Sequence, residues 1–248
     1  MEALEYHTQD KSKWGPGPWE GEADKLQFTD PETDLPCLIV RNQLGALCGY
    51  VGVLETHPWY RKKYSDCTLP TAKPKNWRRV KREGRRLWVW MKESQRKYKI
   101  SEPSDRKFDW RKGLSAHQLG KLVCGDDWCR HTPEALTEVH GGITFSGACQ
   151  SGENEAEGIC HVGEPSGVWW FGFDTAHSMD FVPSMDRRLR DHFGTQKEYR
   201  DVAYVKAEIA ALAKQLIRVS LATRMRAAND EEMNWARAEA KRLGLEVT

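Results

Sequence analysis

The alternation of hydrophobic and polar residues predicts several short strands followed by long C-terminal helices. Two apolar runs, 37–41 and 47–54, flank the turn-like NQLGA and predict a β-hairpin. Both runs are apolar on both faces, which is typical of strands in a core sheet. Strand character returns at 138–147, in ICHV and in VWWFGFD. The last two runs could form another hairpin through a glycine-rich turn.

The strand VWWFGFD has two different faces. Trp169, Phe171 and Phe173 share one face, whereas Trp170 and Asp174 share the other. If the first face is the core, Asp174 and Trp170 point toward the opposite side of the sheet or toward a cleft.

The C-terminal segment 197–244 is predicted to be helical. Its apolar residues fall at alternating spacings of three and four and form one stripe: Val202, Val205, Ile209, Leu212, Leu216 and Val219. A final helix over DEEMNWARAEAKRLG is expected to end at Gly244. The stripe suits packing on the protein's own sheet, and it also suits pairing with a second copy. The oligomeric state therefore stays open.

The order of these elements predicts an α+β fold in a single domain, 1–248. A mainly antiparallel central sheet would carry a helical insertion at 61–130 and the C-terminal helices. Residues 1–35 look mostly irregular, because WGPGPWEGEADK is rich in glycine and proline. Thr132 and Pro133 have the residue types of a helix N-cap and first helical position.

Charge is concentrated in the insertion. The chain has a net charge of +2, yet residues 61–113 hold 19 Lys and Arg against 6 Asp and Glu. Arg78, Arg82 and Arg85 lie among tryptophans, so cations for phosphates and indoles for base stacking occur together. The insertion could therefore bind nucleic acid. It could equally be an amphipathic cover whose charges offset the acidic remainder.

No apolar run approaches the length of about 20 residues that a membrane span needs, so we expect no membrane association. The N-terminal residues lack the apolar centre of a signal peptide. The seven cysteines are scattered and suggest no disulfide framework, and Cys160 is expected to be a free thiol. These features predict a cytoplasmic protein.

Four short sequence blocks, in this order along the chain, resemble those of a known protein family. They are CGYVGV with HPWY, VHGGITFSG, WWFGFDTAHSMD and YRDVAYVKAEI. Together they are similar to a widespread family of small phage and prophage proteins, over about 14–60 and 138–217. The resemblance implies a phage or mobile-element origin, and hence a location in the host-cell cytoplasm. It brings no activity that can be carried over.

The main candidate for chemistry follows the tryptophan-rich strand. Asp174, His177 and Asp180 are three residues apart and would share one side of a helical turn. Such oxygen and imidazole ligands can hold a divalent metal, namely Zn²⁺, Mn²⁺ or Fe²⁺. The alternative is that Asp174 caps the turn and His177 is merely exposed.

Further candidates stand beside other strands. His140 precedes Gly141 and Gly142, which would let a ligand approach the main chain. We expect His140 to meet Asp174 and His177 as a catalytic residue and metal ligand. His57 follows the hairpin, with Trp59 and Tyr60 as a wall, and Trp170 adds a further aromatic surface to the predicted ligand site.

These residues favour three functions. The first is a metal-dependent hydrolase acting on a phosphate-containing or nucleotide-like substrate. The second is a non-enzymatic protein that binds a small anionic ligand, such as a nucleotide signal. The third is a nucleic-acid-binding accessory protein that uses the basic insertion. No P-loop, Rossmann or α/β-hydrolase signature occurs.

Overall fold

Six strands form one antiparallel sheet, which confirms the predicted α+β class. The computed structural model describes residues 3–66, 68, 132–150, 158–161, 167–186, 197–227 and 230–246. Two compact units are present, 1–64 with 137–248, and 65–136. The second unit has nearly the extent of the predicted basic insertion, and its residues up to 131 lie almost entirely outside the described part.

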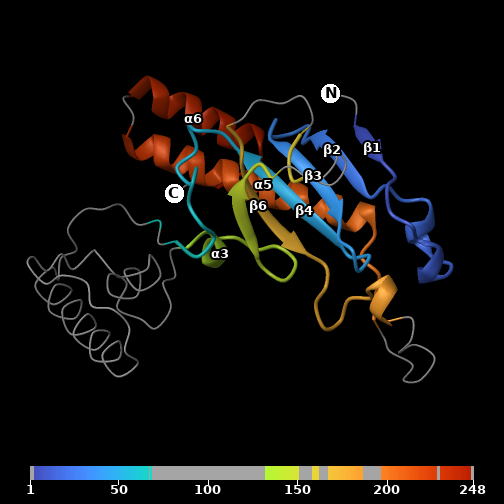
Figure 1. Ribbon diagram of the computed structural model, residues 1–248. Helices are drawn as coiled ribbons and strands as arrows, with labels where there is room; N and C mark the ends of the chain where they lie inside the picture. The colour runs from blue at the N-terminus through green and yellow to red at the C-terminus, as the bar shows by residue number, and fades with distance from the viewer. Residues whose placement is uncertain are drawn as a thin grey trace, which may run out of the picture. The chain divides into compact units, whose positions relative to one another are not determined.

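The strand order in the sheet is β1-β2-β3-β4-β6-β5 (Figure 1). The strands span Leu4–Tyr6 (β1), Lys25–Thr29 (β2), Pro36–Arg41 (β3), Leu47–Val53 (β4), Phe145–Ala148 (β5) and Trp169–Asp174 (β6). β3 and β4 form the predicted hairpin. β6 pairs with β4 on one side and with β5 on the other.

The sequence prediction needs one addition and one correction here. Residues 1–35 are mostly irregular, as predicted, but β1 and β2 within them pair with each other and extend the sheet. The partner of β6 in its outer hairpin is β5 and not the ICHV run, of which Ile159 forms only an isolated bridge to Gln150.

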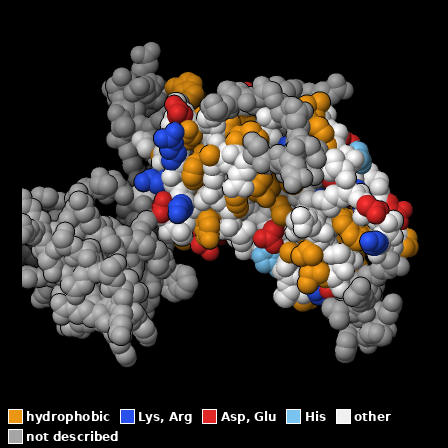
Figure 2. Space-filling model, in the orientation of Figure 1, with side chains coloured by type: hydrophobic (Ala, Val, Ile, Leu, Met, Phe, Trp, Pro, Cys, Tyr) orange, Lys and Arg blue, Asp and Glu red, His pale blue; other side chains and the backbone are white. Residues whose placement is uncertain are grey.

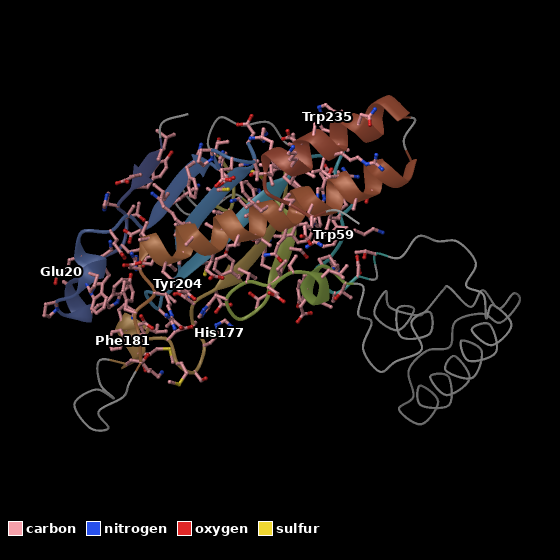
Figure 3. All side chains as sticks on the ribbon, turned by 180° about the vertical axis from the view of Figure 1, so that it is seen from behind. Glu20, Trp59, His177, Phe181, Tyr204 and Trp235 are labelled. Carbon is pink, nitrogen blue, oxygen red and sulfur yellow. A yellow bond between two sulfur atoms is a disulfide. The ribbon has the colours of Figure 1, made fainter. Side chains whose placement is uncertain are left out.

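A long helix covers one face of the sheet. α5, Val202–Ala227, lies across the strands on the side away from the viewer in Figure 1 and toward the viewer in Figure 3. The predicted stripe carries the contact, because Val205, Ile209, Leu212 and Leu216 are fully buried with Phe171 and Phe173 of β6. α6, Asp230–Arg242, packs on α5 through Leu221, Ala236 and Ala240. The stripe therefore packs within the chain.

The opposite face of the sheet has a smaller core of its own. Trp170 is completely buried there with Leu38, Tyr50 and Val168. Burial on both faces explains why the central strands read as continuous apolar runs. Figure 2 shows this side of the molecule, with hydrophobic side chains exposed in several patches among polar ones.

One disulfide joins Cys149 to Cys160, next to the bridge between Gln150 and Ile159. The prediction that Cys160 is a free thiol is therefore wrong. The spacing of the seven cysteines could not reveal this pair, because folding brings it together. Disulfides are typical of oxidising compartments, so this bond does not favour the predicted cytoplasmic location, which stays a prediction. Among the described residues, no helix combines the length and the apolar character needed to span a bilayer.

The predicted helix start at Thr132 is confirmed. α3, Pro133–Leu136, begins directly after Thr132, whose Oγ1 accepts a hydrogen bond of 3.1 Å from the Ala135 amide. α6 is followed by Gly244 at φ +66°, in agreement with the predicted helix end.

Close packing of α5 on β4 depends on Gly49. A Cβ atom at this position would lie 2.5 Å from Phe173 and 3.1 Å from Ile209. We expect Gly49→Ala to lower the free energy of unfolding by about 2 kcal/mol, because the core has no room for the added methyl group. Urea unfolding would measure this. Gly21→Ala is the matched control, since a Cβ there meets nothing within 4 Å; equal losses in both variants would contradict the packing explanation.

Candidate metal centre

His140, His177 and Asp180 lie together and could hold a metal ion. Their potential ligand atoms are all within 4.8 Å of one another. The three residues come from the turn before β5 and from the segment after β6, and they meet at the first turn of α5. Figure 3 labels His177 and Tyr204 near this end of the helix, and the ring of each contacts the ring of His140. Of the two residues that His140 is expected to meet, His177 lies beside it, with ring centroids 5.2 Å apart, whereas Asp174 is not one of the three clustered residues.

Local hydrogen bonds shape the segment after β6. Asp174 Oδ1 accepts a hydrogen bond of 3.0 Å from the Ala176 amide, and Asp180 Oδ2 accepts one of 3.0 Å from the His177 amide. The Asp180 amide in turn donates to the His177 carbonyl. These short loops place His177 and Asp180 on the same side of a tight turn.

His140 is held by α5 through both its backbone and its ring. Its amide donates to Glu208 Oε2 at 2.7 Å, and its Nδ1 lies 2.9 Å from the Tyr204 hydroxyl. Its Nε2 lies 2.7 Å from Asp180 Oδ2. Because an ionised carboxylate only accepts, Nε2 carries a proton in this arrangement; in the tautomer with a proton on Nε2 alone, Nδ1 accepts a hydrogen bond from the Tyr204 hydroxyl.

The two glycines after His140 have the special backbone that the sequence suggested. Gly141 and Gly142 have φ values of +67° and +84°. A Cβ atom at Gly141 would lie 2.0 Å from Nε2 of His177, whereas one at Gly142 would meet nothing within 4 Å. Gly141 therefore allows the His177 ring to lie directly on the turn.

Asp180 is the buried anion of the cluster. Its side chain is 1% exposed, and Arg200 Nε donates to its Oδ1 at 3.1 Å. Burial acts to raise the pKa of Asp180, but the hydrogen bonds from His140, the His177 amide and Arg200 together outweigh it. The pKa therefore lies below its ordinary value and the carboxylate is ionised at neutral pH.

His177 supplies an unused donor atom. Its Nδ1 is buried and has no hydrogen-bond partner among the described residues, although it lies 3.5 Å from Asp180 Oδ2. Ligand atoms around a tetrahedral ion at about 2.1 Å are about 3.4 Å apart, so this separation suits a shared ion. The shorter His140–Asp180 distance would have to lengthen on binding. Histidine nitrogens with a carboxylate oxygen thus fit a divalent metal ion.

Asp174, the fourth predicted ligand, is not one of the three clustered residues. Its Oδ2 accepts a hydrogen bond of 3.0 Å from Thr144 Oγ1, and its Oδ1 is 3.9 Å from His177 Nδ1. The strand alternation explains this, because Asp174 extends from the face of β6 opposite to α5, where it stands across from Cys48 of β4. It borders the cluster and does not complete it.

His57, Trp59 and Tyr60 lie elsewhere. His57 Nε2 is 2.9 Å from the Leu216 carbonyl, and its Nδ1 accepts from the Trp59 amide. Leu216 is 12 residues beyond Tyr204, or about 18 Å along α5. Trp59 is buried in the main core and is labelled well away from His177 in Figure 3, while Tyr60 is half-buried beside it. This group therefore does not join the cluster.

The other predicted ligand-site residues do not join it either. Trp170 is 0% exposed in the outer core, so it packs the sheet and presents no open wall. Arg78, Arg82 and Arg85 lie outside the described residues, and the nucleic-acid prediction stays untested with them.

Three residues of the site were missed by sequence reasoning, namely Arg200, Tyr204 and Glu208. They are spaced by four residues, and Tyr204 and Glu208 lie on one side of α5. The signal in the sequence is the four-residue spacing of these polar side chains. The sequence does not show which strand ends the polar side of the helix contacts, so the three residues could not be assigned to the site.

The cluster is open on one side. The side chain of His177 is 36% exposed and that of Asp174 is 31% exposed, whereas that of His140 is 14% exposed. Solvent or a small ligand can therefore reach His177.

The comparisons with known proteins give no match. Protein-family models, curated proteins and solved structures were all searched, and none resembles the chain.

Paired variants of the glycine turn test the contact with His177. We expect Gly141→Ala and Gly142→Ala each to cost about 1 kcal/mol of stability, because both residues have positive φ. Only Gly141→Ala should displace the His177 ring, and histidine side-chain NMR shifts would show this. A similar His177 shift in Gly142→Ala would contradict the close-approach explanation.

Burial of His57 predicts an acid-sensitive core. Burial lowers the pKa of His57 to about 4, while the ordinary value of 6.5 applies in the unfolded chain. The unfolded state then binds the proton more readily, so stability falls as pH drops from 6.5 to about 4, by about 3 kcal/mol in total.

Urea unfolding at a series of pH values would measure this loss. His57→Gln should flatten the slope in that window, whereas His7→Gln should leave it unchanged, because the side chain of His7 is 53% exposed. Asp180 and Asp24, whose pKa values are lowered, act mainly below pH 3.8 and do not obscure the window. An unchanged slope in His57→Gln would refute the assignment.

Proposed function

We propose that the protein is a metal-dependent hydrolase in which His140, His177 and Asp180 bind one divalent ion, Zn²⁺, Mn²⁺ or Fe²⁺. The observation that carries the proposal is the convergence of three donor atoms, one of which, His177 Nδ1, is buried without a hydrogen bond. Three protein ligands with an open side are typical of catalytic sites and not of closed structural ones.

Outer partners of the ligands support this assignment. Tyr204 contacts the second nitrogen of His140, and Arg200 contacts the second oxygen of Asp180. Such partners fix the orientation and tautomer of metal ligands. With Nε2 facing the ion, Nδ1 of His140 would carry the proton and donate it to the Tyr204 oxygen, so the Tyr204 hydroxyl proton becomes available to another acceptor.

The chemistry of the ion defines the reaction class. A bound divalent ion would supply Lewis acidity and would lower the pKa of a bound water toward neutrality. His177, whose side chain is partly exposed, would lie at the entrance, and Asp174 at 3.9 Å would orient its ring. Histidine and carboxylate pairs of this kind move protons near neutral pH.

Arg200 supports a substrate with an anionic group, such as a phosphoester or a nucleotide. Its Nε and Nη1 donate to Asp180 and Glu198, and its guanidinium lies 4.7 Å from the centre of the Tyr204 ring. Within the described part of the chain, no hydrogen bond occupies its Nη2 group. A planar guanidinium held at the edge of a cation site suits phosphate oxygens.

Metal binding and hydrolysis are tested separately. Purified protein is analysed for bound metal by mass spectrometry, and metal-free protein is titrated calorimetrically with Zn²⁺ and Mn²⁺. We expect His177→Ala to weaken binding by about 100-fold or more and Tyr204→Phe by about 10-fold. His7→Ala is the matched control, because His7 lies outside the cluster with a side chain that is 53% exposed.

Hydrolysis of bis(p-nitrophenyl) phosphate follows with the metal-loaded protein. We expect turnover that requires the ion and is lost in His177→Ala but retained in His7→Ala. Failure of all these ions to bind would refute the metal site. Binding without turnover of this probe or of nucleotides would refute the hydrolase and leave a metal-dependent binding protein.

A further inference from the structure

A second candidate site is a cavity of about 770 Å³ at the hairpin end of the outer sheet face. Tyr50 of β4 is part of the outer core, and Val40 and Cys48 pack against it, so the cavity lies on the face away from α5. Residues from the N-terminal segment and from the β3–β4 hairpin complete its lining. None of the three clustered metal-centre residues is among them.

The charged side chains of Asp24 and Arg41, which line the cavity, already have hydrogen-bond and ion-pair partners within the protein. Asp24 accepts hydrogen bonds from the Thr8 and Gln9 amides and from Arg41 Nε, and Lys11 Nζ lies 2.9 Å from its Oδ1. The other nitrogens of Arg41 donate to the Gly45 carbonyl, Tyr199 and Glu22. The network therefore fixes the shape of the cavity and offers no free charge to a ligand.

Two aromatic side chains form fixed walls. Trp14 is 7% exposed and packs with Trp19 and Phe181, and Tyr50 is 8% exposed and makes an edge contact with Phe145. Aromatic walls that are already ordered give a ring-shaped ligand an apolar contact at little cost in entropy. Ile159 adds a further apolar surface.

The rim supplies uncharged hydrogen-bonding groups. Asn42 Oδ1 accepts from the Leu44 and Ala46 amides, which holds its amide group in place and leaves its NH₂ group to donate. Gln43 and Thr8 also line the cavity, and both residues are exposed. Amides and hydroxyls of this kind match ligand hydroxyl groups.

The cations at the cavity are already paired with carboxylates. Arg41, which lines the cavity, pairs with Asp24 and Glu22, and Lys11 Nζ lies 2.9 Å from Asp24 Oδ1. A phosphate group would lose its hydration here without gaining an unpaired cation, in contrast to the neighbourhood of Arg200.

We infer that this cavity binds an uncharged ring compound with several hydroxyl groups, such as a nucleoside or a simple sugar, and discriminates against its phosphorylated form. The inference does not depend on the metal centre. It rests on fixed aromatic walls, on an uncharged rim and on cations that are already paired with carboxylates.

Calorimetric titration of the full chain in the presence of EDTA tests the inference with two matched pairs of probes. Adenosine is compared with adenosine 5′-monophosphate, and methyl α-glucopyranoside with glucose 6-phosphate. We expect at least one neutral probe to bind saturably and its phosphorylated partner to bind about tenfold more weakly, because the phosphate loses hydration and finds no unpaired cation. No saturable binding of either neutral probe, or equal binding of the phosphorylated partner, would overturn the inference.

Substitutions of residues that line the cavity test where the probes bind and how charge affects their binding. Gln43→Trp should block the cavity mouth and abolish binding, whereas Gln43→Ala should weaken it only a few-fold. Asp10→Asn should strengthen binding of the phosphorylated probe several-fold and leave the neutral probe unchanged. Unaltered binding of the neutral probe in Gln43→Trp would place the ligand elsewhere and refute the cavity site.

Discussion

The hydrogen bond between the buried carboxylate of Asp180 and His140 holds together the end of the molecule that carries the histidine cluster. The two residues are 40 positions apart, and each is tied to further chain segments, His140 to α5 and Asp180 to Arg200. A buried carboxylate is stable only if its oxygens are well bonded, and Asp180 meets this condition with three partners. The Asp180 carboxylate consequently positions three chain segments: the turn before β5, the turn after β6 and the segment that leads into α5.

Two residues of the cluster are fully hydrogen-bonded, and the third has a nitrogen without a hydrogen bond. The side chains of Asp180 and His140 have hydrogen-bond partners, whereas Nδ1 of His177 has no hydrogen-bond partner among the described residues. A buried polar nitrogen without a partner costs free energy, and natural proteins tend to keep such sites where function needs them. The same end of the sheet thus contains a rigid frame and one donor atom that is free for a ligand.

Much of the fold could be predicted because the spacing of apolar residues shows which side of a helix or strand is buried. The stripe from Val205 to Leu216 and the two-faced strand at Trp169–Asp174 identified α5, β6 and the core between them. β1 and β2 could not be recognised, because Lys25 and Gln27 are buried polar residues that hide the strand pattern. In the site, His140, His177 and Asp180 could be named from strand ends and glycines. Their partners Arg200, Tyr204 and Glu208 could not, since only the tertiary packing of α5 shows which strand ends its polar side meets.

The sheet takes all its strands from the unit formed by 1–64 and 137–248, and β4 and β6 pair directly across the gap in sequence. The ladder that joins them therefore needs no backbone group from Ser65–Leu136. The entropy cost of closing a loop rises only slowly as the loop becomes longer. Evolution can accordingly replace, enlarge or delete that intervening stretch while the scaffold and its histidine cluster are inherited intact.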